Sequence, residues 1–158
     1  MSIDEHKQLS NYVYSFAITT RWIDNDMFGH VNNVNYYAFF DSAVNQFLIE
    51  EAGFKPQSSD QIGFIVESSC QYFSPISYPE KLIGAVRVNR LGNSSVEYGV
   101  AIFKSGEMVA SAAGKMTHVF VQRQSHKPSA INTVMRSAMH KALINNASSE
   151  IHKVTENV

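Results

Sequence analysis

The apolar residues of the chain follow two different periods. Between residues 12 and 22 they occupy every second position, which predicts a half-buried strand. The residues that share this parity are Tyr12, Tyr14, Phe16, Ile18 and Trp22. Between residues 34 and 52 they recur every three or four positions, which predicts a helix that ends at Gly53. The helical stripe consists of Tyr36, Phe40, Ala43 and Phe47, widened by Tyr37, Val44 and Leu48. Because the first two turns are apolar almost all round, we expect other structure to wrap this helix.

The rest of the chain is mostly strand-like in its apolar pattern. The predicted strands cover residues 62–73, 81–90, 95–104 and 108–122. The connectors around Gly92 and Gly106 are short and suit hairpin turns, so the last three strands are expected to form an antiparallel meander. A terminal helix is predicted over residues 130–144. One long helix and a single antiparallel sheet make an α+β domain, whose uncovered face and edges favour an oligomer.

Composition narrows the possible classes of function. The 158 residues are 44% hydrophobic, which is enough for one domain with a core. The 13 Lys and Arg residues nearly balance the 14 Asp and Glu residues, which argues against a dedicated nucleic-acid-binding protein. No apolar run approaches the roughly 20 residues that a membrane span needs. The N-terminal stretch is polar and has no signal-peptide core, and we expect a cytoplasmic protein.

The cysteine and histidine content argues against a metal site. Cys70 is the single cysteine, so neither a disulfide within the chain nor a cysteine-based zinc cage can form. The six histidines are not paired at the H-x-H or H-x-x-x-H spacing of metal ligands. We therefore predict no bound metal.

The stretch over residues 21–37, RWIDNDMFGHVNNVNYY, carries the most chemical information. Asp24 and Asp26 lie two positions apart, just before the predicted helix. Acidic residues at this place commonly cap a helix and suit the positive end of its dipole. A carboxylate here can also lie beside a carbonyl oxygen that the first amides of the helix polarise, which is an arrangement for acyl transfer. The spacing alone leaves both interpretations open.

The stretch also resembles a known family signature. It has a basic and aromatic strand end at Arg21 and Trp22, the D-x-D of residues 24–26, the G-H-V-N-N of residues 29–33, and Tyr36 in the helix. This resembles the 4-hydroxybenzoyl-CoA thioesterase-like branch of the hotdog-fold acyl-CoA thioesterases. Later segments, such as FIVESSCQYFSPI at residues 64–76, are similar to that family too. The resemblance covers roughly residues 12–135 and predicts a hotdog domain over residues 11–135. It leaves a flexible arm at residues 1–10 and a helix end and tail at residues 136–158.

The resemblance implies a fold and an activity. The fold is the hotdog, in which one long central helix is wrapped by an antiparallel sheet of about five to six strands. Such chains form homodimers, or homotetramers made of two dimers, with the active sites at the dimer interface. The implied enzyme is a thioester hydrolase that cleaves acyl-CoA, or an acyl carrier protein thioester, to the free acid and the thiol. It needs no cofactor, because coenzyme A is part of the substrate.

The resemblance also implies roles for individual residues. Asp26 falls on the catalytic carboxylate, as nucleophile or general base, and the backbone amide of Asn33 falls on the group that polarises the carbonyl. His30 is a further catalytic candidate. We expect the apolar neighbours Met27, Phe28 and Tyr36 to bury Asp26 in part. The expected substrate-binding residues are Gly29, Val31, Tyr36, Phe64, Arg90, Ser94 and Ser95.

Other interpretations stay open at this point. An arginine followed by a Gly/Ser turn, as at residues 90–95, suits the phosphates of CoA but also an ordinary solvated strand end. Asp24 is expected to hold the turn or the side chain of Arg21. The alternative functions are a non-catalytic acyl- or CoA-binding protein and a hotdog hydratase or dehydratase, because fold alone does not determine function. The paired His and Asp or Glu motifs of the hydratases are not seen in the sequence.

Overall fold

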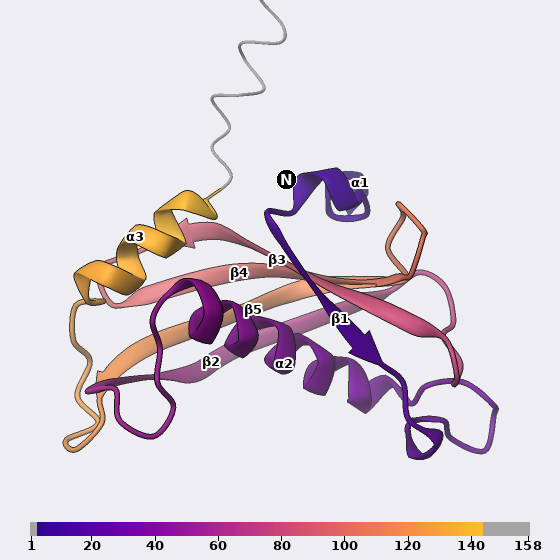
Figure 1. The fold of residues 1–158 in the computed structure, drawn as a ribbon, viewed down its shortest axis with the longest axis horizontal. Helices are drawn as coiled ribbons and strands as arrows, with labels where there is room; N and C mark the ends of the chain where they lie inside the picture. Colours follow the sequence, from indigo (N-terminus) through magenta and orange to yellow (C-terminus); the bar gives the residue numbers. More distant parts are fainter. Residues whose placement is uncertain (1–2, 144–158) are drawn as a thin grey trace, which may run out of the picture.

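A five-stranded antiparallel sheet packs along the helix α2 (Figure 1). The computed structural model describes residues 3–143, so the predicted helix end and tail at residues 136–158 lie outside them from residue 144 on. The strand order is β1-β3-β4-β5-β2, so β1 and β2 form the two edges. The elements are α1 (Ile3–His6), a 3-10 turn η1 (Leu9–Asn11), β1 (Tyr14–Thr19), a 3-10 turn η2 (Trp22–Asp24), α2 (Asn33–Glu51), β2 (Gln61–Tyr72), β3 (Lys81–Leu91), β4 (Ser95–Lys104), β5 (Ala112–Gln122) and α3 (Thr133–Lys141). The predicted α+β class is confirmed.

Helix α2 (Asn33–Glu51) lies one residue before the predicted range 34–52 at each end. The side chain of Asn32 caps its first turn by accepting a hydrogen bond from the amide of Val34 at 3.2 Å. It ends before Gly53, whose φ of +68° lies in the left-handed region that favours glycine. The side chains that it buries against the sheet are Tyr36, Phe39, Phe40, Ala43, Val44, Phe47 and Leu48. The sequence prediction of a wrapped helix is therefore confirmed.

The strands β3, β4 and β5 form the predicted meander. Two details of the strand predictions were wrong. The first strand ends at Thr19, and Trp22 lies beyond it in η2 with 82% of its surface exposed. The fifth strand begins at Ala112 rather than at residue 108, because the backbone of Met108 accepts a hydrogen bond from Leu9 instead of extending the strand.

The segment before β1 covers the face of the sheet opposite α2. Arg87 on β3 points to this face, because its neighbours Val86 and Val88 pack toward the helix. Its guanidinium is buried, lies 4.7 Å from the ring centre of Tyr12 and donates to the carbonyl of Asn11 at 3.1 Å. Residues 3–11, which fall in and beside the expected N-terminal arm, are thus hydrogen-bonded to the sheet.

His118 is a buried imidazole in the core beneath α2. It is 3% exposed, and burial lowers its pKa to about 4. Its ring meets that of Tyr98 edge to face at 5.2 Å, and its Nδ1 atom has no hydrogen-bond partner among the described residues. Gly63 on the neighbouring strand makes room for it, because a Cβ atom there would lie 2.8 Å from Nδ1. The neutral form of His118 is therefore the form that the fold accepts.

We expect His118 to make the fold less stable in acid. Below pH 6.5 the imidazole of the unfolded chain binds a proton that the folded chain accepts only near pH 4. The stability that depends on neutral His118 is therefore fully present at neutral pH and is lost as the pH falls from 6.5 toward 4. A shift of this size corresponds to about 3 kcal/mol in the free energy of unfolding. Urea unfolding at pH 7 and pH 4.5 should show a smaller decrease in the His118→Phe variant than in the wild type. The exposed His140→Gln variant is the control, and equal decreases in wild type and His118→Phe would contradict the assignment.

Candidate active site

Asp26 lies in a tight turn, the Asp26 turn, that connects η2 to α2. Asn25 and Val31 form an isolated antiparallel bridge across this turn. Inside it the Asp26 amide donates to the carbonyl of His30 at 3.0 Å, and the Gly29 amide donates to the carbonyl of Asp26 at 3.1 Å. Gly29 has a φ of +84°, which a residue with a side chain adopts only with strain. These backbone hydrogen bonds thus fix the position of the Asp26 backbone from which its side chain extends.

The Asp26 carboxylate is half-buried, and its Oδ1 atom accepts a hydrogen bond from the Phe28 amide at 2.9 Å. The expectation that Met27 and Phe28 bury it was wrong. Met27 is 94% exposed and Phe28 is 82% exposed. Both lie at the tip of the turn, where the backbone that closes the turn directs side chains away from the sheet.

Asp24 has the structural role that the sequence analysis expected. Its side chain is fully buried and accepts from the Arg21 amide at 2.7 Å and from the Arg21 guanidinium at 2.8 Å. Its carbonyl accepts from the amide of Asn32 at 2.9 Å and from the side chain of Asn35 at 3.0 Å. Asp24 therefore joins the turn to the first residues of α2, and its carboxylate is already fully engaged.

The start of α2 opens onto a cavity of about 340 Å³. Asn33 is the first residue of the helix, and by helical geometry its amide has no acceptor within the helix. The positive end of the helix dipole lies at the same place. The cavity is lined by His30, Val31, Asn33, Tyr36, Tyr72, Phe73, Ser74 and Pro75. The structure thus brings four predicted residues together on one cavity, and Gly29 and Asp26 lie in the turn that leads into it.

Two tyrosines form one wall of this cavity. The rings of Tyr36 and Tyr72 meet edge to face at 5.0 Å, and the Tyr72 hydroxyl donates to the carbonyl of Asn33 at 3.2 Å. Burial raises the pKa of Tyr36 to about 12 and raises the pKa of Tyr72 above its ordinary value. Both phenols therefore stay protonated near neutral pH. Sequence reasoning missed Tyr72, although its position at the end of a predicted strand just before Pro75 was a usable signal.

The other predicted binding residues lie elsewhere in the chain. Phe64 pairs with Val119, whose side chain points away from α2, so Phe64 lies on the face of the sheet opposite the cavity. Arg90, Ser94 and Ser95 lie around the turn between β3 and β4. This turn is at the Val119 end of β5, whereas Tyr72 pairs with Ala112 at the other end. A single chain therefore does not bring these residues to the cavity.

Arg136 on α3 is a residue that the sequence analysis did not single out. Its guanidinium donates to the carbonyls of Gly92 at 3.0 Å and Asn93 at 2.6 Å, so it holds the turn beside Ser94 and Ser95.

Among residues 3–143, no group of three or more His, Cys, Asp or Glu side chains is arranged to bind a metal ion. None of the helices in this part of the chain is long and apolar enough to cross a membrane.

Comparisons with known proteins identify the family and the fold of the chain. The model of the thioesterase superfamily matches residues 28–111. The PA5185 protein from Pseudomonas aeruginosa strain PAO1 is 48% identical, with a TM-score of 0.85 over 87% of this chain and 96% of that one. None of the curated proteins compared matches the chain.

Two more distant structures share the fold alone. Slr0204, a 1,4-dihydroxy-2-naphthoyl-CoA thioesterase from Synechocystis, is 15% identical, with a TM-score of 0.73 over 80% of this chain and 95% of that one. The hypothetical protein SAV2348 from Staphylococcus aureus, in complex with CoA, is 13% identical, with a TM-score of 0.73 over 83% of this chain and 85% of that one. Together with the topology, these similarities confirm the predicted hotdog fold.

Proposed function

The chain belongs to the thioesterase superfamily, and we propose that it hydrolyses acyl-CoA thioesters to the free acid and CoA. The observation that carries the proposal is the position of the Asp26 turn beside the first amide of α2, at the edge of one cavity. A carboxylate and an amide donor are sufficient groups for the cleavage of a thioester. The CoA bound to SAV2348 and the aromatic acyl-CoA after which the Slr0204 thioesterase is named support the same class of substrate.

The proposed reaction uses the helix amide and the carboxylate in succession. The thioester carbonyl oxygen accepts a hydrogen bond from the Asn33 amide, which stabilises the negative charge that develops on that oxygen. Asp26 either attacks the carbonyl carbon or removes a proton from a water molecule that attacks it. The carbon–sulfur bond then breaks, and the CoA thiolate leaves and takes up a proton. In the first route, water afterwards hydrolyses the anhydride formed with Asp26.

His30 and Tyr36 are further side chains that a single chain contributes to the proposed site. His30 lines the cavity with an exposed side chain, so its imidazole is the candidate that protonates the departing thiolate. Tyr36 is 3% exposed and forms part of the wall against which the acyl group packs. Val31 is also buried in this wall, and the amide of Gly29 closes the turn that precedes it.

A second copy of the chain would complete the site. Strand β2 is an edge strand of 12 residues whose residues 64–69 are exposed, and such an edge is a ready surface for pairing. Two copies that pair antiparallel along β2 bring the Phe64 end of one copy next to the Tyr72 end of the other. The turn with Arg90, Ser94 and Ser95 then approaches the neighbouring cavity. We therefore assign Arg90, Ser94 and Ser95 to the CoA end of a site shared between two copies, in a homodimer or a dimer of dimers.

The double variant Ile65→Lys, Val66→Lys is expected to disrupt this pairing, because it places positive charge on the exposed edge of the sheet. Sedimentation should give two or four times 17.7 kDa for the wild type and 17.7 kDa for the double variant, which should also lose hydrolysis. Val134→Lys changes another exposed apolar residue, which lies on α3, and serves as the control. A wild type that is monomeric and still hydrolyses acyl-CoA would contradict the shared site.

The function is tested by measuring thiol release from a panel of short, medium, long and aromatic acyl-CoAs, with an acyl carrier protein thioester included. We expect release from at least one class, and the panel ranks the acyl groups at the same time. Calorimetry with CoA distinguishes the alternative of a binding protein. Binding of CoA without release from any member of the panel would replace the hydrolase by that alternative.

A further inference from the structure

The segment of residues 72–78 crosses the Asp26 turn and the start of α2. Its contacts with them alternate between side chain and backbone. Tyr72 Oη donates to the Asn33 carbonyl at 3.2 Å, the Ile76 carbonyl accepts from the Val31 amide at 2.7 Å, Ser77 Oγ donates to the Gly29 carbonyl at 2.8 Å, and the Tyr78 amide donates to Asn25 Oδ1 at 3.0 Å. The Asp26 turn is therefore fixed along its length by residues far away in the sequence.

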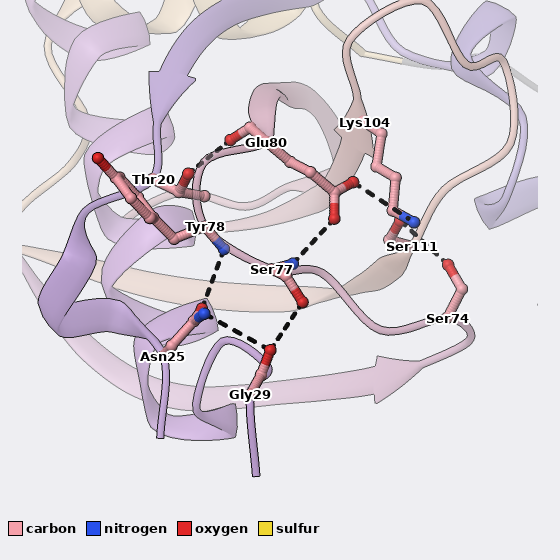
Figure 2. Close-up of polar contacts among 9 residues, drawn as sticks. All are labelled: Thr20, Asn25, Gly29, Ser74, Ser77, Tyr78, Glu80, Lys104 and Ser111. Atoms are coloured by element: carbon pink, nitrogen blue, oxygen red, sulfur yellow. Dashed lines mark hydrogen bonds and ion pairs between the residues drawn. The ribbon is translucent and has the colours of Figure 1, made fainter. Parts of the chain in front are cut away.

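Of the two side chains of this segment that make these contacts, Ser77 bonds the residue closer to Asp26 in the sequence. Figure 2 shows its hydroxyl pointing at the carbonyl of Gly29, which the Asn25 side chain also approaches at 3.5 Å. The amide of the same glycine closes the turn by donating to the carbonyl of Asp26. The Ser77 hydroxyl therefore holds the Gly29–His30 peptide group, which directly follows the amide that closes the turn.

Ser77 is itself held by the sheet. Its amide donates to Glu80 Oε1 at 3.0 Å, and Glu80 Oε2 lies 3.5 Å from Lys104 Nζ at the end of β4 (Figure 2). The carbonyl of Glu80 accepts from the hydroxyl of Thr20 at 2.6 Å. This network joins the Asp26 turn to β3 and β4, which are rigid elements, and such support is what a precisely placed catalytic group needs.

We propose that Ser77 is a positioning residue, which holds the Asp26 turn at a fixed orientation to the Asn33 amide. The inference rests on the proposed thioester hydrolysis and adds a residue that acts through Gly29 rather than on the substrate. Its physical basis is that small displacements of a reacting group from its productive geometry reduce the rate strongly, while they leave substrate binding almost unchanged.

The test compares Ser77→Ala with Ser111→Ala. Ser111 is a matched control, because its buried hydroxyl bonds the hydroxyl of Ser74 at 3.1 Å and it holds the same segment through its backbone. We expect Ser77→Ala to lower kcat about tenfold with KM within about twofold of wild type, because the turn loses its anchor. Ser111→Ala should keep both constants. Ser77→Thr, which retains the hydroxyl, should restore most of kcat.

Hydrogen exchange gives a readout that does not depend on the reaction. In Ser77→Ala the amides of Asp26 and Gly29 should exchange faster than in wild type, while amides in the middle of β4 keep their protection. Unchanged exchange of the turn, or equal losses of kcat in Ser77→Ala and Ser111→Ala, would overturn the inference. If the wild type releases no thiol from any acyl-CoA, the proposed function fails, and exchange alone then decides whether Ser77 positions the turn.

Discussion

Asp26→Asn is expected to lower kcat for thioester hydrolysis by about 10²–10⁴-fold, the usual contribution of a positioned acid–base group. Asparagine has the shape of aspartate, and its side-chain oxygen can still accept the hydrogen bond from the Phe28 amide. The turn should therefore keep its structure, while the group that attacks the carbonyl or removes a proton from water is lost. Thiol release from the best acyl-CoA of the panel measures the effect.

The matched control for this variant is Asp41→Asn, which removes an exposed carboxylate from α2. It should hydrolyse at the wild-type rate, and both variants should unfold at the wild-type temperature. Near-normal hydrolysis by Asp26→Asn would contradict its catalytic role. It would leave the Asn33 amide and the imidazole of His30 as the groups of the cavity to test next.

The part of the site that could be predicted from the sequence is the part that is contiguous in it. The turn of residues 24–31 runs directly into α2, so a local pattern was enough to place Asp26 beside the helix start. Ser77 reaches this turn from 48 residues away, and Tyr72 reaches the first residue of α2 from 39 residues away. No local pattern records such contacts. Their contribution became visible once the sheet had placed the end of β2 next to the helix.

Phe64 shows how one irregularity changes a site prediction. Phe64 and Tyr72 have the same parity, so a regular strand would place both on the helix-facing side. The pairing of β2 with β5 shifts register between Ile65 and Glu67, and this bulge turns Phe64 to the opposite face. Met27 and Phe28 are a second example. Their apolar side chains suggested burial, but the tight turn exposes them.

The fold was predicted where periodicity controls it and was not predicted where long-range contacts control it. The helix α2 and the meander follow from apolar spacing and short connectors. The docking of residues 3–11 depends on Arg87, a charged residue buried in the middle of β3. A buried arginine that binds a distant segment through one carbonyl group and an aromatic ring has no signature in the local pattern of the chain.

Asn33→Pro is expected to lower kcat by about 10²–10³-fold, the usual effect of removing one oxyanion donor. Proline removes the backbone N–H and leaves the helix intact, because it is favoured at the first helical position. The preceding residue, Asn32, already has φ −60° and ψ 138°, a conformation that a following proline accepts. Its cap on the Val34 amide does not involve the deleted group.

The comparison with Asn33→Ala separates the amide from the side chain. Alanine keeps the N–H and should retain most of the activity that the proline variant loses. Thermal unfolding of all the proteins should coincide, because neither change touches a buried group. Equal losses in the two variants would assign the effect to the asparagine side chain. A proline variant as active as the wild type would show that another donor polarises the carbonyl, since proline has no amide proton to offer.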